Sequence, residues 1–131
     1  MIVDASAFIA ILRAEPDAAV YANALRSTNV RRISAINFVE ASIVIDGARD
    51  PVARGEFDDL FQDLSLTIEP VTEEQARIAR DAYRDFGKGS RNPAQLNLGD
   101  VFAYALAKVT REPLLFKGND FVHTDIRSAL D

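Results

Sequence analysis

The chain has 131 residues, 48% of them apolar, and a net charge of −5, which describes a single acidic domain over residues 1–131 with one packed interior. No apolar run approaches the roughly 20 residues that cross a bilayer, and the N-terminus has no secretory pattern. The absence of cysteine excludes disulfides and thiolate zinc sites and fits a cytoplasmic protein. The acidic balance also argues against a protein that binds nucleic acid through a generally basic surface.

Short apolar runs alternate with helical patterns along the chain, which predicts an α/β domain around a parallel sheet. Strands are expected at residues 1–3, 30–34, 66–71 and 113–116, with a last short strand near Ile126. Helices are expected at residues 6–12, 18–26, 35–48, from 51 onward, at 72–87 and at 100–110. Residues 87–99, rich in Gly, Asn, Ser and Pro, are predicted to form a long loop.

Two carboxylates follow predicted strands. Asp4 ends the first apolar run, and Asp120 follows the strand at 113–116. Parallel strands bring their carboxyl ends to one edge of the sheet, where ligands bind, so both side chains are expected at that edge. The alternatives are that Asp4 caps the next helix and that Asp120 belongs to an ordinary Gly-Asn-Asp turn.

Two further carboxylates lie on predicted helices. Ile36, Val39 and Ile43 have the spacing of a buried stripe, and Glu40 occupies a position within it. Asp100 begins a helix that is apolar on nearly every side. The alternatives are that Glu40 reaches water at the edge of the stripe and that Asp100 only caps its helix.

Four converging carboxylates would repel one another unless a cation lay among them. Oxygen ligands without Cys or clustered His favour Mg²⁺, with Mn²⁺ as a substitute. Such a site supports hydrolysis of a phosphodiester, because a bound metal ion activates water and stabilises the leaving oxygen. Ser6, two residues after Asp4, is a candidate to hydrogen-bond a carboxylate or the scissile phosphate, or to cap the helix.

These residues resemble the PIN domain of VapC-type toxins. The resemblance covers essentially the whole chain and is carried by four segments in order: Met1-Ile2-Val3-Asp4-Ala5-Ser6, Glu40 on the helix after the second strand, Leu98-Gly99-Asp100, and Leu115-Phe116-Lys117-Gly118-Asn119-Asp120-Phe121 with Thr124-Asp125-Ile126. It implies a three-layer α/β/α sandwich whose short, mostly parallel sheet has about five strands.

The resemblance also implies a function. It is that of a magnesium-dependent endoribonuclease toxin of a type II toxin–antitoxin pair, with Asp4, Glu40, Asp100 and Asp120 as the catalytic metal ligands. The implied partners are RNA, a cognate VapB-type antitoxin that blocks the site, and a second copy of the chain in a homodimer and larger assemblies.

An acidic ribonuclease needs a local basic patch. Arg77, Arg80, Arg84 and Lys88 share one face of the helix at 72–87 and could follow an RNA backbone, or they form a solvated face balanced by nearby acids. Lys117 is a candidate for phosphate contact near the metal, or a solvated turn lysine. Of these, Arg84, Lys88 and Lys117 are the predicted substrate-binding side chains, together with Ser6.

Two other classes of protein remain open from the residues alone. A receiver-like phosphoacceptor domain has similar layering but places an Asp after a middle strand, where this chain has Thr72-Glu73. A catalytically inactive interaction module is the second alternative, although all four acids are present. Phe8, Leu12, Phe57 and Phe61 are expected in the core, with a groove for an antitoxin helix as the alternative.

Overall fold

The structure is a computed structural model that describes all residues from Met1 to Asp131. Its sheet has four strands, all parallel, in the order β3-β2-β1-β4. The strands are β1 (Ile2–Val3), β2 (Arg32–Ser34), β3 (Thr67–Glu69) and β4 (Leu114–Leu115). The prediction of a fifth strand near Ile126 is wrong, because the chain there makes only an isolated bridge between Leu114 and Ser128.

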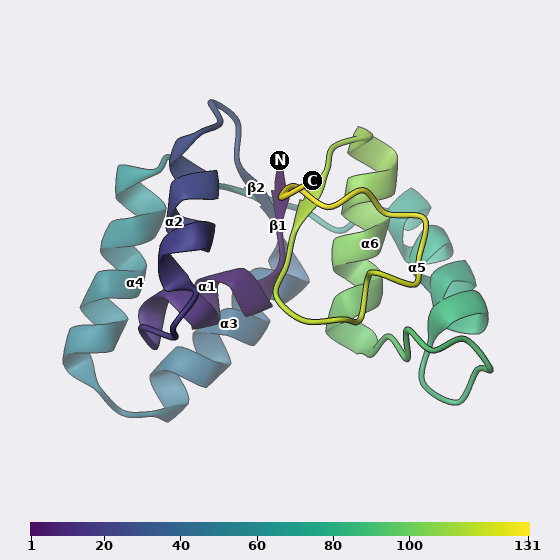
Figure 1. The fold of residues 1–131 in the computed structure, drawn as a ribbon, viewed down its shortest axis with the longest axis horizontal. Coiled ribbons are helices and arrows are strands. Elements are labelled where there is room, and N and C mark those ends of the chain that lie inside the picture. Colours follow the sequence, from purple (N-terminus) through teal and green to yellow (C-terminus); the bar gives the residue numbers. More distant parts are fainter.

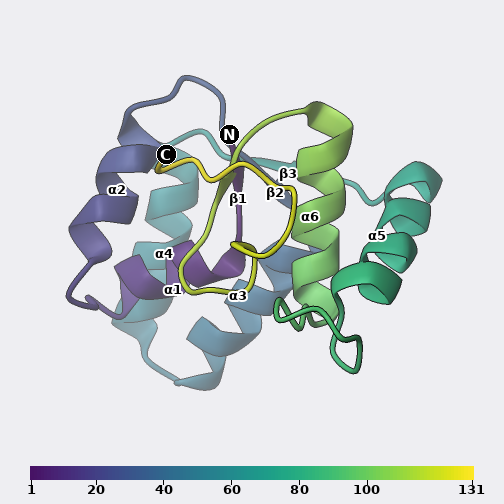
Figure 2. The same ribbon diagram turned by 45° about the vertical axis from the view of Figure 1, so that its right-hand side comes forward.

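Helices cover both faces of the sheet, which confirms the predicted three-layer α/β architecture. Figure 1 shows α1 to α4 on one side of β1 and β2, and α5 and α6 on the other side. In the turned view of Figure 2, α2 and α4 remain on one side of β1 and α5 and α6 on the other, while α3 passes below β1. None of the helices is both long and apolar enough to span a membrane. The helices are α1 (Ala5–Leu12), α2 (Ala18–Arg26), α3 (Ala35–Gly47), α4 (Pro51–Asp63), α5 (Glu73–Phe86) and α6 (Leu98–Thr110).

The core lies on both faces of β1. Successive side chains of a strand point to opposite faces, so Ile2 packs with α5 and α6 while Val3 packs with α1 and α2. Both side chains are fully buried. The predicted aromatic core is confirmed: Phe8 stacks on Phe61 with ring centroids 5.0 Å apart and meets Phe57 edge-on at 6.3 Å. The chain therefore leaves β1 at Asp4 between two packed layers.

The predicted buried stripe of α3 is wrong. Ile36, Val39 and Ile43 are 36%, 50% and 66% exposed. The inward face of α3 carries Asn37, Ala41 and Ile45 instead. This helix is apolar on two faces, and spacing alone does not reveal which of them the neighbouring helices cover.

The first turn of α6 also differs from the prediction. This helix begins at Leu98 rather than at Asp100, because Asn97 caps it. The Asn97 side chain accepts from the Asp100 N–H, and the Asp100 side chain accepts from the Asn97 N–H, each at 2.9 Å. This reciprocal pair is a capping box, which satisfies two donors of the first turn. The capping box places Asp100 in the first turn of α6, where both its backbone N–H and its carboxylate are held by Asn97.

Candidate metal centre and active site

All four predicted acids line one hollow of about 250 Å³ at the carboxyl end of the sheet. Asp4 comes from the end of β1, Asp120 from the turn after β4, and Glu40 and Asp100 from α3 and α6. We call this the acid hollow; its lining also includes Ser6, Asn97 and Lys117. Segments as far apart as residues 4 and 120 thus meet at one place, as the parallel strand order requires.

Asp4 is the most deeply buried of the four acids. Its side chain is 4% exposed, and Oδ2 accepts from the Ser6 N–H at 3.0 Å and from the Ser6 hydroxyl at 2.6 Å. The other oxygen, Oδ1, is buried without any hydrogen-bond partner. Burial raises the pKa of Asp4, the Ser6 hydrogen bonds oppose that rise, and Asp120 adds to it. The residue caps α1 with one oxygen, and the other oxygen has no hydrogen-bond partner.

Asp100 follows the same pattern. Its Oδ2 takes part in the capping box, and the side chain is 7% exposed. Burial raises the pKa of Asp100 to about 7; the hydrogen bond from Asn97 opposes the rise, and the charges of Asp4, Asp120 and Glu40 add to it. Each of these carboxyls therefore feels the others as unfavourable charge, which is the condition that a bound cation relieves.

Glu40 is half-buried on α3, next to Asn37. Its Oε1 accepts from the Asn37 side-chain amide at 3.3 Å. Burial raises the pKa of Glu40, and the negative charge of Asp4 raises it further, while the hydrogen bond from Asn37 lowers it. Glu40 and Asp4 line the same hollow, so the two carboxyl groups face one site.

Asp120 and Lys117 lie on the segment that follows β4. Asp120 is exposed and lines the acid hollow. The Lys117 ammonium is paired with Glu15 and with Oδ1 of Asp17, the latter at 2.9 Å, and the Lys117 N–H donates to the Ser6 hydroxyl at 3.0 Å. The lysine side chain therefore ties the segment after β4 to the loop between α1 and α2 and has partners before any substrate arrives.

The donor set fits a hard divalent cation. Every acid in the hollow offers carboxylate oxygen, and Oδ1 of Asp4 is a buried acceptor with nothing to accept. Mg²⁺ and Mn²⁺ prefer such ligands. In the present side-chain conformation, no group of three or more Asp, Glu, His or Cys residues is arranged to hold an ion. An ion bound by three of these acids therefore requires rotation of at least one carboxylate.

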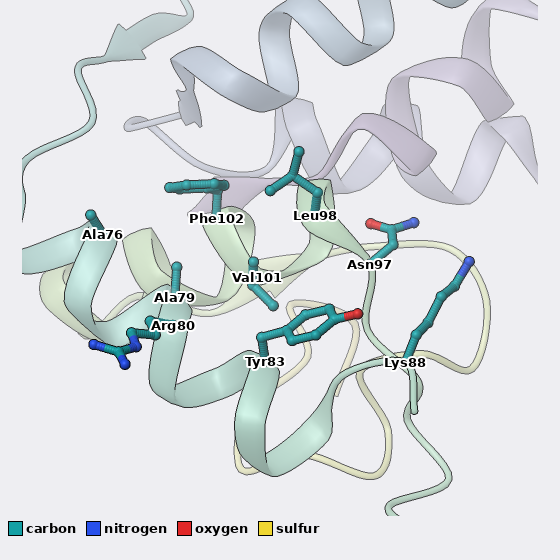
Figure 3. Close-up of a pocket in the computed structure, with 9 residues that line it drawn as sticks. All are labelled: Ala76, Ala79, Arg80, Tyr83, Lys88, Asn97, Leu98, Val101 and Phe102. Carbon is teal, nitrogen blue, oxygen red and sulfur yellow. The ribbon is translucent and has the colours of Figure 1, made fainter. Parts of the chain in front are cut away.

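The predicted basic residues of α5 and of the segment that follows it lie outside the acid hollow. Arg84 is paired with Asp85 at 3.1 Å and with Asp81 at 3.5 Å. Lys88 and Arg80 instead line a second hollow of about 520 Å³ between α5 and α6. Figure 3 shows this hollow with Arg80 at one end, Lys88 and Asn97 at the other, and the Tyr83 ring between them. Asn97 lines both hollows, so the two are neighbours.

Reasoning from the sequence missed two residues of this site. Asn97 lines the acid hollow and positions Asp100 through the capping box. The signal was present, because Asn followed three residues later by Asp before an apolar helix is an N-terminal capping pattern. Asn37 is fully buried beside Glu40, and no local pattern distinguishes it from the other residues of the helix at 35–48.

The chain is similar to known proteins along its whole length. A sequence profile of the PIN domain matches residues 1–127. The VapC ribonuclease Mb0625 of Mycobacterium bovis and the ribonuclease VapC28 of Mycobacterium tuberculosis are each 58% identical over 131 residues, which is 100% of this chain and 98% of each relative. The ribonuclease VapC42 of M. tuberculosis is 49% identical over 129 residues, or 98% of each chain.

A solved structure shows the same fold. The M. tuberculosis toxin VapC20, described as cleaving the sarcin–ricin loop, superposes with a TM-score of 0.76 at 13% identity and covers 95% of both chains. At that identity the likeness establishes the fold alone. The profile and the relatives of 49–58% identity establish the family: the chain belongs to the PIN-domain family, in its VapC branch. Because the chain belongs to this family, it is not a receiver-like phosphoacceptor domain.

Proposed function

We propose that the chain is a Mg²⁺-dependent endoribonuclease, the toxin of a type II toxin–antitoxin pair, and that it hydrolyses RNA phosphodiester bonds at the acid hollow. The observation that carries the proposal is the convergence of Asp4, Glu40, Asp100 and Asp120, from four separate segments, on one hollow. The names of the relatives support the reaction class, because Mb0625, VapC28 and VapC42 are all called ribonucleases.

The four acids would hold the ion, with Asp4 and Asp100 as its principal ligands. A bound Mg²⁺ supplies a water of lowered pKa and positive charge for the phosphate oxygens. The protein's own residues fix the ligands. The Ser6 hydroxyl holds Oδ2 of Asp4, and the capping box holds Oδ2 of Asp100. Oδ1 of Asp4 is left without a partner, and Glu40 and Asp120 add their negative charges to the same hollow.

RNA must approach a chain that carries net negative charge. Arg80 and Lys88 line a hollow without acidic residues in its lining, next to the acid hollow at Asn97. Phosphate groups bind where cations are not already neutralised by neighbouring carboxylates. Lys88 is therefore a better candidate for backbone contact than Arg84, whose guanidinium is paired twice.

Two protein partners belong to the proposal. A VapB-type antitoxin would neutralise the site by placing a basic side chain among the four acids, where burial and mutual repulsion favour a cation. A second copy of the chain would cover the exposed face of α3. Ile36, Val39, Ile43 and Leu98, four large apolar side chains that are 36–70% exposed, line one apolar hollow of about 490 Å³ there. Apolar faces of this kind mark protein interfaces.

RNA cleavage by the purified protein tests the proposal. With Mg²⁺ the parent chain should cut RNA, a chelator should stop the reaction, and Asp4→Asn should lose activity while keeping its fold by circular dichroism. Asp58→Asn, at an exposed carboxylate on α4, is the matched control and should cut at the parent rate. A parent chain without metal-dependent activity, or an active Asp4→Asn variant, would instead indicate an inactive interaction module or a different site.

A further inference from the structure

Asn37 joins the helix that carries Glu40 to the helix that carries Asp100. Its side chain is fully buried on the inward face of α3. The amide nitrogen donates to the Gly99 carbonyl at 2.9 Å and to Oε1 of Glu40 at 3.3 Å. One buried amide group therefore contacts both the Glu40 carboxylate and Gly99, the residue that precedes Asp100.

The side-chain oxygen of Asn37 argues against a purely structural role for this residue. Its Oδ1 is buried without a hydrogen-bond partner. Such an atom costs free energy, whereas an apolar side chain of similar size at the same place leaves no unsatisfied acceptor on residue 37. Core packing alone would be served as well by Leu. The presence of an amide at this position is therefore explained by the two hydrogen bonds that its nitrogen donates, to Glu40 and to the Gly99 carbonyl.

Gly99 supplies the second observation. It lies in the first turn of α6 with an ordinary helical backbone, so no left-handed conformation requires glycine at this position. A Cβ at this position would lie 2.6 Å from Cδ of Glu40 and would overlap the carboxylate oxygens. The space left by the missing side chain is thus filled by the Glu40 carboxylate, beside the backbone of Asp100.

We infer that Asn37 is a positioning residue that acts through Glu40: its amide and the space at Gly99 together hold the Glu40 carboxylate against the first turn of α6, at the wall of the hollow that Asp4 and Asp100 also line. The inference rests on the proposed metal site and adds two residues to it. Neither residue touches the ion or the RNA. Their effect on metal binding passes through the position of one carboxylate.

Binding of Mn²⁺ to paired variants, measured by calorimetry, tests the inference. Asn37→Leu and Gly99→Ala should each weaken binding by about tenfold or more, as losses of supporting contacts to metal ligands do. In a Glu40→Ala background the same two substitutions should change the dissociation constant by less than about twofold, because the group through which they act is gone. The turnover number for RNA should follow the same pattern, with KM unchanged.

Gly99→Ala keeps the test decisive if Asn37→Leu unfolds. Alanine favours the helix, and the obstructing atoms lie at the far end of the Glu40 side chain, which can rotate away. The variant should therefore melt at or above the parent temperature while binding Mn²⁺ more weakly. Gly55→Ala on α4, where a Cβ meets nothing within 4 Å, is the matched control and should keep parent affinity.

Three results would overturn the inference. In the first, Asn37→Leu and Gly99→Ala bind Mn²⁺ as tightly as the parent. In the second, their losses are equal with and without the Glu40 carboxylate, which would indicate a general structural effect. In the third, the parent chain neither binds Mn²⁺ nor cuts RNA; that result removes the proposed function itself and this role with it. The first two leave the proposed function standing.

Discussion

The Ser6 hydroxyl lies 2.6 Å from Oδ2 of Asp4 and at the same time accepts the Lys117 N–H at 3.0 Å. One side chain thus links the ends of two neighbouring parallel strands, β1 and β4, at the carboxyl edge of the sheet. It also holds one oxygen of the most buried acid in a fixed direction. The hydroxyl therefore serves the fold and the acid hollow together.

Ser6→Ala should lower both stability and activity. Loss of the two hydrogen bonds should reduce the free energy of unfolding by about 1–3 kcal/mol, as measured by urea denaturation. Release of Asp4 should slow RNA cleavage by about tenfold or more. Ser42→Ala removes a hydroxyl that bonds only the Phe38 carbonyl within α3 and should leave the cleavage rate unchanged. Cleavage by Ser6→Ala at the parent rate would exclude this role for the hydroxyl.

Asp100 should make the metal-free protein less stable as the pH rises. Burial raises its pKa from 3.8 to about 7, so between these values the folded chain keeps a proton that the unfolded chain has lost. The destabilisation is absent below the lower value and complete above the upper one, and it amounts to at most about 4 kcal/mol. Asp4 and Glu40, whose pKa values are also raised, act in the same direction.

Urea unfolding between pH 4 and pH 8 in the presence of a chelator measures this effect. Asp100→Asn keeps an acceptor for the Asn97 N–H but cannot ionise, so its stability should fall less over this range than that of the parent. Saturating Mn²⁺ should stabilise the parent most at the upper end of the range, because the ion binds the deprotonated carboxyls. Identical pH profiles for parent and Asp100→Asn would show that this carboxyl does not titrate as proposed.

Lys88 should contribute more to RNA binding than Arg84. Lys88 lines the hollow beside the acid hollow, whereas Arg84 is paired with Asp81 and Asp85. In an Asp4→Asn background that prevents cleavage, Lys88→Ala should weaken RNA binding and reduce the salt dependence by about one phosphate contact. Arg84→Ala should have a smaller effect, and Arg54→Ala, an arginine on α4 paired with Asp46, should have none. Equal affinities for the Lys88 and Arg84 variants would contradict this assignment.

The exposed face of α3 should hold two copies of the chain together. Light scattering should give the parent twice the chain mass of 14.4 kDa, and Ile43→Asp should give the single mass, because a charge within the apolar face opposes its burial. Val52→Asp, at an exposed valine on α4, should leave the dimer intact. A monomeric parent at micromolar concentration, or a dimeric Ile43→Asp variant, would be inconsistent with this interface.

Much of the fold and the identity of the four acids could be read from the sequence. For Asp4 and Asp100 the sequence leaves capping and site formation as alternatives, and the structure shows that capping and lining of the hollow occur together. In each residue Oδ2 caps a helix, and in Asp4 the second oxygen stays without a partner. Helix caps involve residues only two or three positions apart, so the sequence alone can predict them.

The errors arose where tertiary packing decides. The spacing of Ile36, Val39 and Ile43 is correct for a stripe, yet only the placement of neighbouring helices decides that Asn37, Ala41 and Ile45 face inward. The roles of Asn37 and Gly99 depend on contact between residues 62 positions apart. The partners of Lys117 are about 100 positions away. No local pattern encodes such distant pairings.

The most direct test of the account is the position of Mn²⁺ in crystals of the active protein, located by its anomalous scattering. The account predicts a peak in the acid hollow, with carboxylate oxygens of Asp4 and Asp100 at about 2.0–2.3 Å and with Glu40 or Asp120 turned towards it. A hollow without a peak at a manganese concentration that supports RNA cleavage, or a peak bound by other residues, would contradict it.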